Sequence, residues 1–269
     1  MKVLATDFDG TLFRDRTITP ADLNAIQRFR RAGNRFGIVT GRHYCSILEE
    51  VQKNNVPLDF LICCTGGILT DGVFHLLSEH RAPSAALRPL LEVTKDFNGM
   101  YFCLSRYEKR LWFSTGVPAP YDGVALLPDS ALDQIDGFHE MGTRFENEEM
   151  AQNYTDTLNR EYSHFVTAHR NGIYVDVCAP HTGKVSGLYE MLGLLGVPPQ
   201  NLTVAGDNLN DLEMIREFSS FAVSSGRAEL KSEANFVAPD IDAIVSRLLC
   251  ALQTASNCAT ILSVLKIFK

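Results

Sequence analysis

The sequence lacks the cysteine and histidine patterns that mark a zinc site or a disulfide framework. None of its seven cysteines forms a C-x-x-C pair, and no group of His and Cys residues has zinc-site spacing. Cys63 and Cys64 are adjacent within an apolar run, so they would point to opposite faces of a strand. This usage favours reduced, buried thiols in a cytoplasmic protein.

The chain also lacks an excess of positive charge. Lys and Arg number 25 against 32 Asp and Glu, for a net charge of −7. An acidic protein repels nucleic acid and anionic lipid, so we expect neither nucleic acid nor membrane as a partner. Internal repeats and low-complexity segments are absent. The first residues, Met1-Lys2-Val3-Leu4, lead soon into acidic ones, which predicts no signal peptide and a cytoplasmic location.

A long, uninterrupted hydrophobic run is missing as well. The stretch from Leu248 to Leu265 has no charged residue and approaches the length of a membrane span. Gln, Thr, Ser and Asn residues interrupt it, whereas genuine spans are predominantly apolar. We therefore expect a C-terminal helix packed on the core, followed by a loose tail, and no membrane anchor.

The composition that remains is that of a globular protein. Apolar residues make up 45% of the chain and charged residues 21%, which is close to the average for soluble domains and excludes disordered and fibrous classes. A length of 269 residues allows one large domain or two modest ones.

Alternating strand and helix patterns open the chain. Short apolar runs at Val3–Ala5, Phe36–Val39 and Phe60–Cys64 predict buried strands. Two helical patterns separate them, and the first begins at Thr19-Pro20, where Thr suits the N-cap and Pro the first helical position. The order β-α-β-α-β is typical of a parallel sheet with helices on both faces.

A different pattern occupies residues from about 82 to 180. Just before it, Asp71-Gly72 predicts a hairpin with a type I′ turn. Within it we expect helices near 84–97 and 148–162, strands near 100–104, 111–114 and 138–143, a loop with Pro118, Pro120 and Pro128, and a hairpin whose turn is His169-Arg170-Asn171-Gly172. The α/β pattern returns at Gly183.

The sequence therefore predicts an α/β protein with two domains. Residues 1–81 and 181–269 would form a Rossmann-like parallel sheet core with helices on both faces. Residues 82–180 would form an inserted α+β cap domain.

Four polar motifs stand where predicted strands end or helices begin. They are Asp7-Phe8-Asp9-Gly10-Thr11, Thr40-Gly41-Arg42, Lys184 and Gly206-Asp207-Asn208-Leu209-Asn210-Asp211. Each has an ordinary alternative explanation: an Asx turn, a strand-to-helix turn, a solvated charge or helix capping. In an open α/β sheet, however, ligands bind beyond the carboxyl ends of the strands. The motifs are thus expected to converge on one site.

This set of motifs resembles the haloacid dehalogenase superfamily, and within it the Cof-type phosphatases that carry a type IIB cap. The resemblance implies that Asp7 is the nucleophile and that Asp9 acts first as general acid and then as base. It also implies that Thr40 and Lys184 hold the transferring phosphoryl group.

The same resemblance implies a Mg²⁺ cofactor. Its ligands would be Asp7, the main-chain carbonyl of Asp9, and Asp207, while Asp211 would stand behind them and orient metal-bound water. Besides the residues with catalytic roles, the phosphate or substrate would meet Gly10, Gly41, Arg42 and Asn210.

The likeness runs from Met1 to about Leu252 and includes two departures. Thr65-Gly66 stands where the family often has Asn-Gly, and Ser225-Gly226-Arg227-Ala228 stands where it often has Met-Gly-Asn-Ala. Both are expected near the rim of the active site, so substrate specificity cannot be carried over from relatives.

The resemblance implies a Mg²⁺-dependent phosphatase that hydrolyses a small phosphorylated metabolite through an aspartyl-phosphate. Sugar phosphates are the first candidates for the substrate. Its partner would be a small-molecule phosphate ester, and the protein would be a monomer or homodimer. Asp9 favours rapid hydrolysis, because relatives that need a long-lived aspartyl-phosphate carry Thr at this position. A phosphomutase on the same scaffold and a catalytically silent binding or regulatory protein remain as alternatives.

Specificity is expected to come from the inserted segment. The four motifs would contact only phosphate and metal, and residues 12–18 are too few to form a lid. An insert that closes over the site would exclude water and contact the leaving group. The turn His169-Arg170-Asn171-Gly172 is a candidate contact, with a solvent-exposed turn as the alternative.

Overall fold

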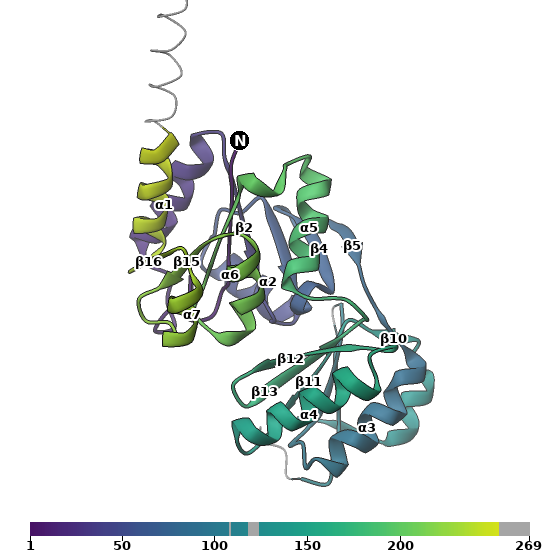
Figure 1. Cartoon of the computed structure of the whole chain (residues 1–269). Coiled ribbons are helices and arrows are strands. Elements are labelled where there is room, and N and C mark those ends of the chain that lie inside the picture. The colour runs from purple at the N-terminus through teal and green to yellow at the C-terminus, as the bar shows by residue number, and fades with distance from the viewer. Residues whose placement is uncertain (108, 118–123, 253–269) are drawn as a thin grey trace, which may run out of the picture.

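An eight-stranded sheet with the order β16-β15-β14-β1-β2-β3-β4-β5 is the largest element of the structure (Figure 1). The structure is a computed structural model and describes residues 1–107, 109–117 and 124–252. Six neighbouring strands are parallel: β1 (Val3–Thr6), β2 (Arg35–Val39), β3 (Phe60–Cys63), β14 (Leu202–Gly206), β15 (Ser219–Val223) and β16 (Phe236–Ala238). β4 (Ile68–Asp71) and β5 (Leu76–Glu79) extend one edge in antiparallel fashion. The predicted parallel α/β core is confirmed.

Strand alternation divides the apolar side chains of this sheet between two helical layers. In β1, Leu4 packs into one layer while Val3 and Ala5 pack into the other. The first layer is formed by α1 (Pro20–Arg31), α2 (Tyr44–Lys53) and the helical residues 241–252. The second is formed by α5 (Lys184–Leu195), α6 (Leu212–Glu217) and α7 (Ala228–Glu233). Strands buried on both faces are what a parallel sheet requires.

The C-terminal helix packs on the first layer through Ile241, Ile244 and Val245. The remainder of the predicted helix and tail, from Gln253 onward, lies outside the described residues. In the described ranges, no helix combines the length and the hydrophobicity needed to cross a bilayer.

The predicted type I′ turn at Asp71-Gly72 is wrong. β4 ends at Asp71 and β5 begins only at Leu76, and Phe74, not Gly72, has a positive φ of 69°. The cause is the side chain of Asp71, whose Oδ1 accepts hydrogen bonds of 2.9 Å from the backbone N–H groups of Val73 and His75. A carboxylate that satisfies two loop amides favours a longer connection than the two-residue turn.

The inserted segment contains a second sheet with the order β12-β13-β11-β7-β8-β9. Its strands are β7 (Phe102–Arg106), β8 (Lys109–Phe113), β9 (Leu126–Leu127), β11 (Glu140–Arg144), β12 (Thr167–Asn171) and β13 (Tyr174–Cys178). Two helices, α3 (Leu87–Asp96) and α4 (Glu148–Glu161), cover one face. β6 (Ala82–Pro83) and β10 (Gly137–Phe138) form a short pair of their own. The predicted inserted α+β unit is therefore present, and the division at residues 82 and 180 stays a prediction.

Two details of this segment differ from expectation. The turn predicted at His169-Arg170-Asn171-Gly172 is shifted, because β12 extends to Asn171 and the turn is Gly172-Ile173, where Gly172 has a φ of 61°. Of the predicted proline loop, Pro118 and Pro120 lie outside the described residues, and Pro128 precedes a short 3₁₀ helix.

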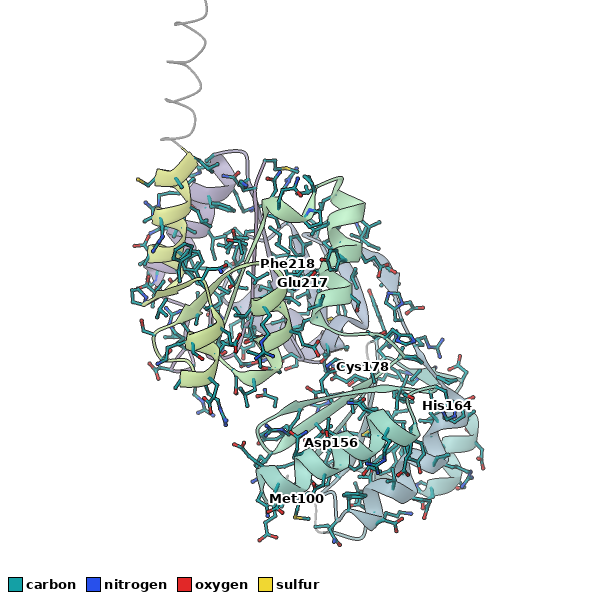
Figure 2. All side chains as sticks on the ribbon, viewed as in Figure 1. Met100, Asp156, His164, Cys178, Glu217 and Phe218 are labelled. Atoms are coloured by element: carbon teal, nitrogen blue, oxygen red, sulfur yellow. The ribbon has the colours of Figure 1, made fainter. Side chains whose placement is uncertain are left out.

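The second sheet has one apolar and one polar face. Met141, Val175 and Val177 lie in the hydrophobic cluster formed with α3 and α4. Because side chains alternate along a strand, Tyr174 and Asp176 project from the opposite face. In Figure 1, β12 lies beside the larger sheet and α4 lies farther from it, and Figure 2 places Cys178 at the junction. The polar face of the insert is thus turned toward the central sheet.

Candidate active site

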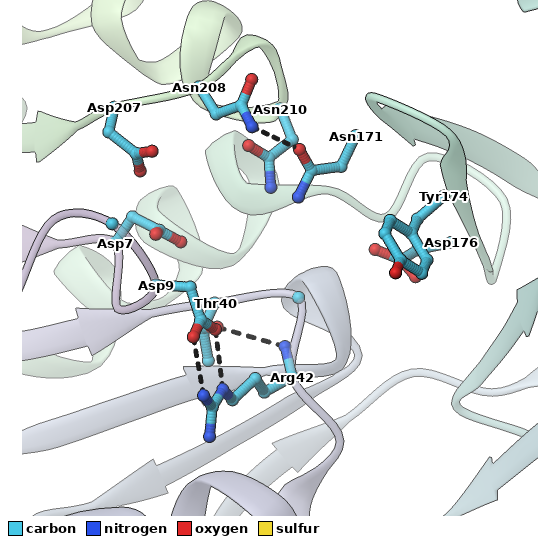
Figure 3. A pocket seen from close by; sticks show the side chains of 12 residues that line it. Asp7, Asp9, Thr40, Arg42, Asn171, Tyr174, Asp176, Asp207, Asn208 and Asn210 are labelled. Atoms are coloured by element: carbon cyan, nitrogen blue, oxygen red, sulfur yellow. Dashed lines mark hydrogen bonds and ion pairs between the residues drawn. The ribbon is translucent and has the colours of Figure 1, made fainter. Parts of the chain in front are cut away.

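The four motifs converge at the carboxyl edge of the central sheet, as predicted. They follow β1, β2 and β14 and open α5. A cavity of about 670 Å³ lies at this edge, lined by Asp7, Asp9, Gly10, Thr40, Gly41, Arg42, Asn171, Tyr174, Asp176, Asp207, Asn208 and Asn210 (Figure 3). All predicted site residues except Lys184 and Asp211 line this cavity. Those two lie behind Asp7.

Lys184 is buried between two carboxylates. Its Nζ donates to Asp7 Oδ1 at 2.6 Å and to Asp211 Oδ1 at 2.5 Å, and all three side chains are almost fully enclosed. Burial acts to lower the pKa of Lys184, but the charges of Asp211 and Asp7 outweigh it and raise that pKa. Lys184 is therefore a permanent cation, and it fixes the position of the Asp7 carboxyl at the cavity floor. Burial raises the pKa of Asp7, and Lys184 opposes that rise.

The Asp211 carboxylate accepts hydrogen bonds from other groups of the protein. Besides pairing with Lys184, its carboxylate accepts backbone N–H groups of Asp207 at 3.0 Å and Asn208 at 3.3 Å. These contacts hold the loop after β14 against Lys184. Of the three neighbouring carboxylates Asp7, Asp207 and Asp211, it is consequently Asp7 and Asp207 that face the cavity.

Asp207 lies directly against the backbone of the first motif. Thr11 Oγ1 donates to Asp207 Oδ1 at 3.0 Å. Gly10 has a φ of +81°, and a Cβ at this position would lie 2.3 Å from Asp207 Oδ2. Both the backbone conformation and the close approach therefore require glycine. Burial, followed by the charge of Asp211, raises the pKa of Asp207 to about 6.

Asp9 is held by Arg42 in a bidentate ion pair. Arg42 Nε donates to Asp9 Oδ2 at 2.7 Å and Nη2 donates to Oδ1 at 2.6 Å. The guanidinium also lies over the rings of Phe8 and Phe13, at 4.9 and 5.5 Å from their centroids. Arg42 is thus placed on Asp9 instead of being free for a phosphate, and its predicted contact with substrate stays a prediction. Thr40, which is buried, accepts a hydrogen bond from the Arg42 N–H through its Oγ1.

With this geometry in view, similarity to known proteins identifies the family. The sequence model of the haloacid dehalogenase-like hydrolases matches residues 4–244. The chain belongs to this family. The match spans both the central sheet and the insert, so the resemblance predicted from the four motifs is confirmed.

Named relatives of this hydrolase are phosphatases. It is 26% identical over 261 residues to the pyridoxal phosphate phosphatase YbhA of Escherichia coli, covering 89% of this chain and 93% of the relative. It is 24% identical over 251 residues to a putative bifunctional phosphatase/peptidyl-prolyl cis-trans isomerase of Streptococcus pyogenes; that match takes in 90% of this chain but 52% of the longer relative. Among solved structures, a subclass IIB sugar phosphatase superposes with a TM-score of 0.75 at 19% identity, over 92% of this chain and 98% of the other.

Sequence reasoning missed part of the cavity wall that the hydrolase's insert supplies. Tyr174 and Asp176 of β13 line the cavity, whereas only the turn residues 169–172 had been considered. Of these, Asn171 reaches the cavity, and its Oδ1 accepts a hydrogen bond from Asn208 Nδ2 at 2.8 Å. The alternation Tyr-Val-Asp-Val in residues 174–177 was the available signal, since it separates a polar from an apolar face.

Both departures from the family pattern contact the insert. Thr65 Oγ1 donates to Glu140 Oε2 at 3.0 Å in a buried hydrogen bond, and Thr65 has a left-handed φ of 50°. Arg227 Nη2 donates to Glu148 Oε1 at 2.7 Å. These residues therefore join the hydrolase core to the insert on two sides of the cavity.

Proposed function

We propose that this hydrolase is a Mg²⁺-dependent phosphatase that cleaves the phosphate monoester of a small metabolite through an aspartyl-phosphate. Sugar phosphates are the first candidates for its substrate. One observation carries the proposal: Asp7 and Asp9 face the same cavity, and a buried lysine holds Asp7 from behind. The names of the relatives, a pyridoxal phosphate phosphatase and a sugar phosphatase, support the substrate class. Within this proposal the protein acts in the cytoplasm, as a monomer or homodimer.

The cavity supplies the two groups that such a reaction needs. Asp7 Oδ attacks phosphorus, the bond to the ester oxygen breaks, and Asp9 gives that oxygen a proton, so the alcohol leaves. Asp9 then takes a proton from water as the water attacks the aspartyl-phosphate, which releases phosphate and restores Asp7. Lys184 stabilises the negative charge on the phosphoryl oxygens, because catalysis of phosphoryl transfer is mainly positioning and electrostatics. Thr40 lies at the same cavity wall to donate a hydrogen bond.

A Mg²⁺ ion belongs to this proposal because the donor set suits it. Carboxylate oxygens of Asp7, Asp207 and Asp211 all lie within 4.8 Å of one another, and oxygen donors are what hard divalent cations prefer. With Asp211 occupied by Lys184 and two N–H groups, the residues that would hold the ion are Asp7, Asp207 and the main-chain carbonyl of Asp9. When bound, the ion would neutralise charge between Asp7 and the phosphate.

The proposed function is tested by phosphate release from purified protein. We expect p-nitrophenyl phosphate to be hydrolysed with Mg²⁺ and not with EDTA, and a panel of phosphorylated metabolites to give the physiological substrate class. No hydrolysis of any ester would favour the silent binding protein. Transfer of the phosphoryl group to a second hydroxyl of the metabolite, without free phosphate, would favour the phosphomutase.

Mg²⁺ should stabilise the protein more at about pH 7.5 than at about pH 5. The pKa of Asp207 is raised to about 6, so at the lower pH a proton competes with the cation for this carboxyl. Without the ion, Asp207 lowers the free energy of unfolding as the pH rises toward 6, because the folded state binds the proton more tightly than the unfolded state does. Thermal unfolding with and without excess MgCl₂ at both pH values measures the difference.

Asp207→Asn serves as the comparison for that measurement, since it removes the titrating group while keeping its shape. We expect the variant to show a smaller Mg²⁺ effect with a weaker dependence on pH, since Asp7 is the one carboxylate ligand that remains. An identical Mg²⁺ shift at both pH values in the unmodified protein would exclude Asp207 as a ligand.

Asp9→Asn should lower kcat by about 10²–10⁴-fold for a sugar phosphate. The loss should be smaller for p-nitrophenyl phosphate, because p-nitrophenolate leaves without a proton. The Asp9 carboxylate is paired with Arg42, so it must exchange this partner for the leaving oxygen. Equal losses for the two esters, measured under the same conditions, would contradict the acid role.

A further inference from the structure

The insert contributes one charged residue to the described wall of the cavity, and that residue is an acid. Asn171, Tyr174 and Asp176 are the insert's lining residues. Figure 3 shows Tyr174 and Asp176 across the cavity from Asp7 and Asp207. If the phosphate is held at Asp7, as in the proposed function, Tyr174 and Asp176 lie where the leaving group must be.

The Asp176 carboxylate has no cation beside it on this wall. Of the described lining residues, Arg42 carries the positive charge, and its Nε and Nη2 atoms both donate hydrogen bonds to Asp9. In the described parts of the chain we find no hydrogen bond or ion pair to the Asp176 side chain. The carboxylate lies close to the second motif, since a Cβ on Gly41 would lie 3.0 Å from Asp176 Oδ2.

The same face of the second sheet carries Glu140, and the basic residues on this face have other contacts. His169, which pairs with Asp176, has its Nε2 2.7 Å from the Thr182 carbonyl oxygen, and the Arg110 guanidinium lies over the Trp112 ring. On β11, Gly142 pairs with Asp176 and Glu140 pairs with Cys178, so Glu140 and Asp176 share one face. Burial, together with the charge of Asp176, raises the pKa of Glu140. Burial also raises the pKa of Asp176 to about 7, with Lys184 acting against that rise. A carboxyl group in such surroundings gains most from a ligand that brings hydrogen-bond donors or positive charge.

We propose that Asp176 selects the leaving group, so that the enzyme favours phosphate monoesters whose leaving group presents ammonium or hydroxyl donors and disfavours those with a second negative charge. This inference rests on the proposed function and narrows its substrate class. A hydroxyl or ammonium group donates to the Asp176 carboxylate, which faces the cavity and is half-buried. A second carboxylate or phosphate meets the same oxygens with no cation between them. The buried cation of the site, Lys184, stands at the other end, behind Asp7, and it orients the ester with its phosphate toward Asp7.

Three 6-phosphate esters with the same number of carbon atoms test the inference: glucosamine 6-phosphate, glucose 6-phosphate and 6-phosphogluconate, whose leaving groups carry an ammonium group, hydroxyl groups alone and a carboxylate. Each is measured as KM where it is hydrolysed, or as Ki against p-nitrophenyl phosphate where it is not. For the unmodified enzyme we expect binding in that order, with about tenfold between the first and the last. In Asp176→Asn, glucosamine 6-phosphate should bind about tenfold more weakly, and 6-phosphogluconate should bind more tightly than before. Asp176→Glu should restore the original order.

Opposite changes for the two charged esters separate recognition from damage, since a distorted site would weaken all three together. Asp156→Asn is the control, because Asp156 is exposed on α4, on the far side of the second sheet (Figure 2); it should leave all three values unchanged. Equal affinities for the three esters, or parallel changes in Asp176→Asn, would overturn the inference while leaving the phosphatase intact. Absence of any hydrolysis with Mg²⁺, p-nitrophenyl phosphate included, would instead reject the proposed function.

Discussion

Replacing Asp7 by Asn should lower kcat by at least about 10⁴-fold, because covalent catalysis and the organisation of a cation fail together. The amide keeps the shape of the side chain but is no nucleophile. The fold should survive, since Lys184 keeps its second contact with the buried Asp211. Initial rates of phosphate release, with p-nitrophenyl phosphate and with the best metabolite, measure the loss.

Asp15→Asn provides the matched control for Asp7→Asn. Asp15 lies in the same connection between β1 and α1 but is exposed to solvent. Its substitution should leave kcat within about twofold. The preparation must be free of contaminating phosphatase. Activity of Asp7→Asn near that of the unmodified enzyme would then exclude Asp7 as the nucleophile.

Lys184→Met should have the next largest effect, on activity and on stability together. Removing one preorganised donor from the phosphoryl site should cost about 10²–10³-fold in kcat. The variant also leaves Asp7 and Asp211 buried without their cation, and breaking a buried pair from one side costs about 3–5 kcal/mol. Urea unfolding near neutral pH measures that loss, with the exposed Lys53→Met of α2 as a control that should stay within about 0.5 kcal/mol.

The stability lost by Lys184→Met should depend on pH in a defined direction. Without the lysine, nothing from residue 184 opposes the effect of burial on Asp7, and the Asp7 carboxyl binds a proton more tightly in the folded than in the unfolded state. The free energy of unfolding then falls as the pH rises. The difference from the unmodified protein should therefore be larger near pH 8 than near pH 5. A difference that stays constant across this range would show that Asp7 does not depend on Lys184 for its charge.

The parts of this fold that the sequence predicts are those encoded by neighbouring residues. Short apolar runs that end in a polar motif locate β1 and β2, and Thr19-Pro20 marks the start of α1, where Thr19 Oγ1 accepts from Asp22 N–H. Convergence of the motifs then follows from the rule for open α/β sheets. These inferences need no knowledge of how distant segments dock.

Features that depend on how distant segments pack against each other could not be predicted from the sequence. The ion pair of Asp9 with Arg42 joins residues 33 positions apart, and the contact of Thr65 with Glu140 spans 75. The alternation along β13 predicts that Tyr174 and Asp176 share a face, but only the orientation of the insert shows that this face closes the cavity. The turn predicted at Asp71-Gly72 was wrong for a different reason. The Asp71 side chain competes with the backbone turn for the same N–H groups.

The pairing of β1 with β14 has a consequence for how the protein is made. Val3 lies opposite Leu202 in the sheet, and Asp7 meets its partners at positions 184 and 211. A ribosome must therefore synthesise the entire insert before the first strand finds its neighbour on that side. The insert has its own hydrophobic cluster and contacts closer in sequence, so it can fold while the tunnel still holds α5 to α7. The nascent chain carries the proposed nucleophile, Asp7, from the start of synthesis, yet the four motifs can converge only after the last of them emerges.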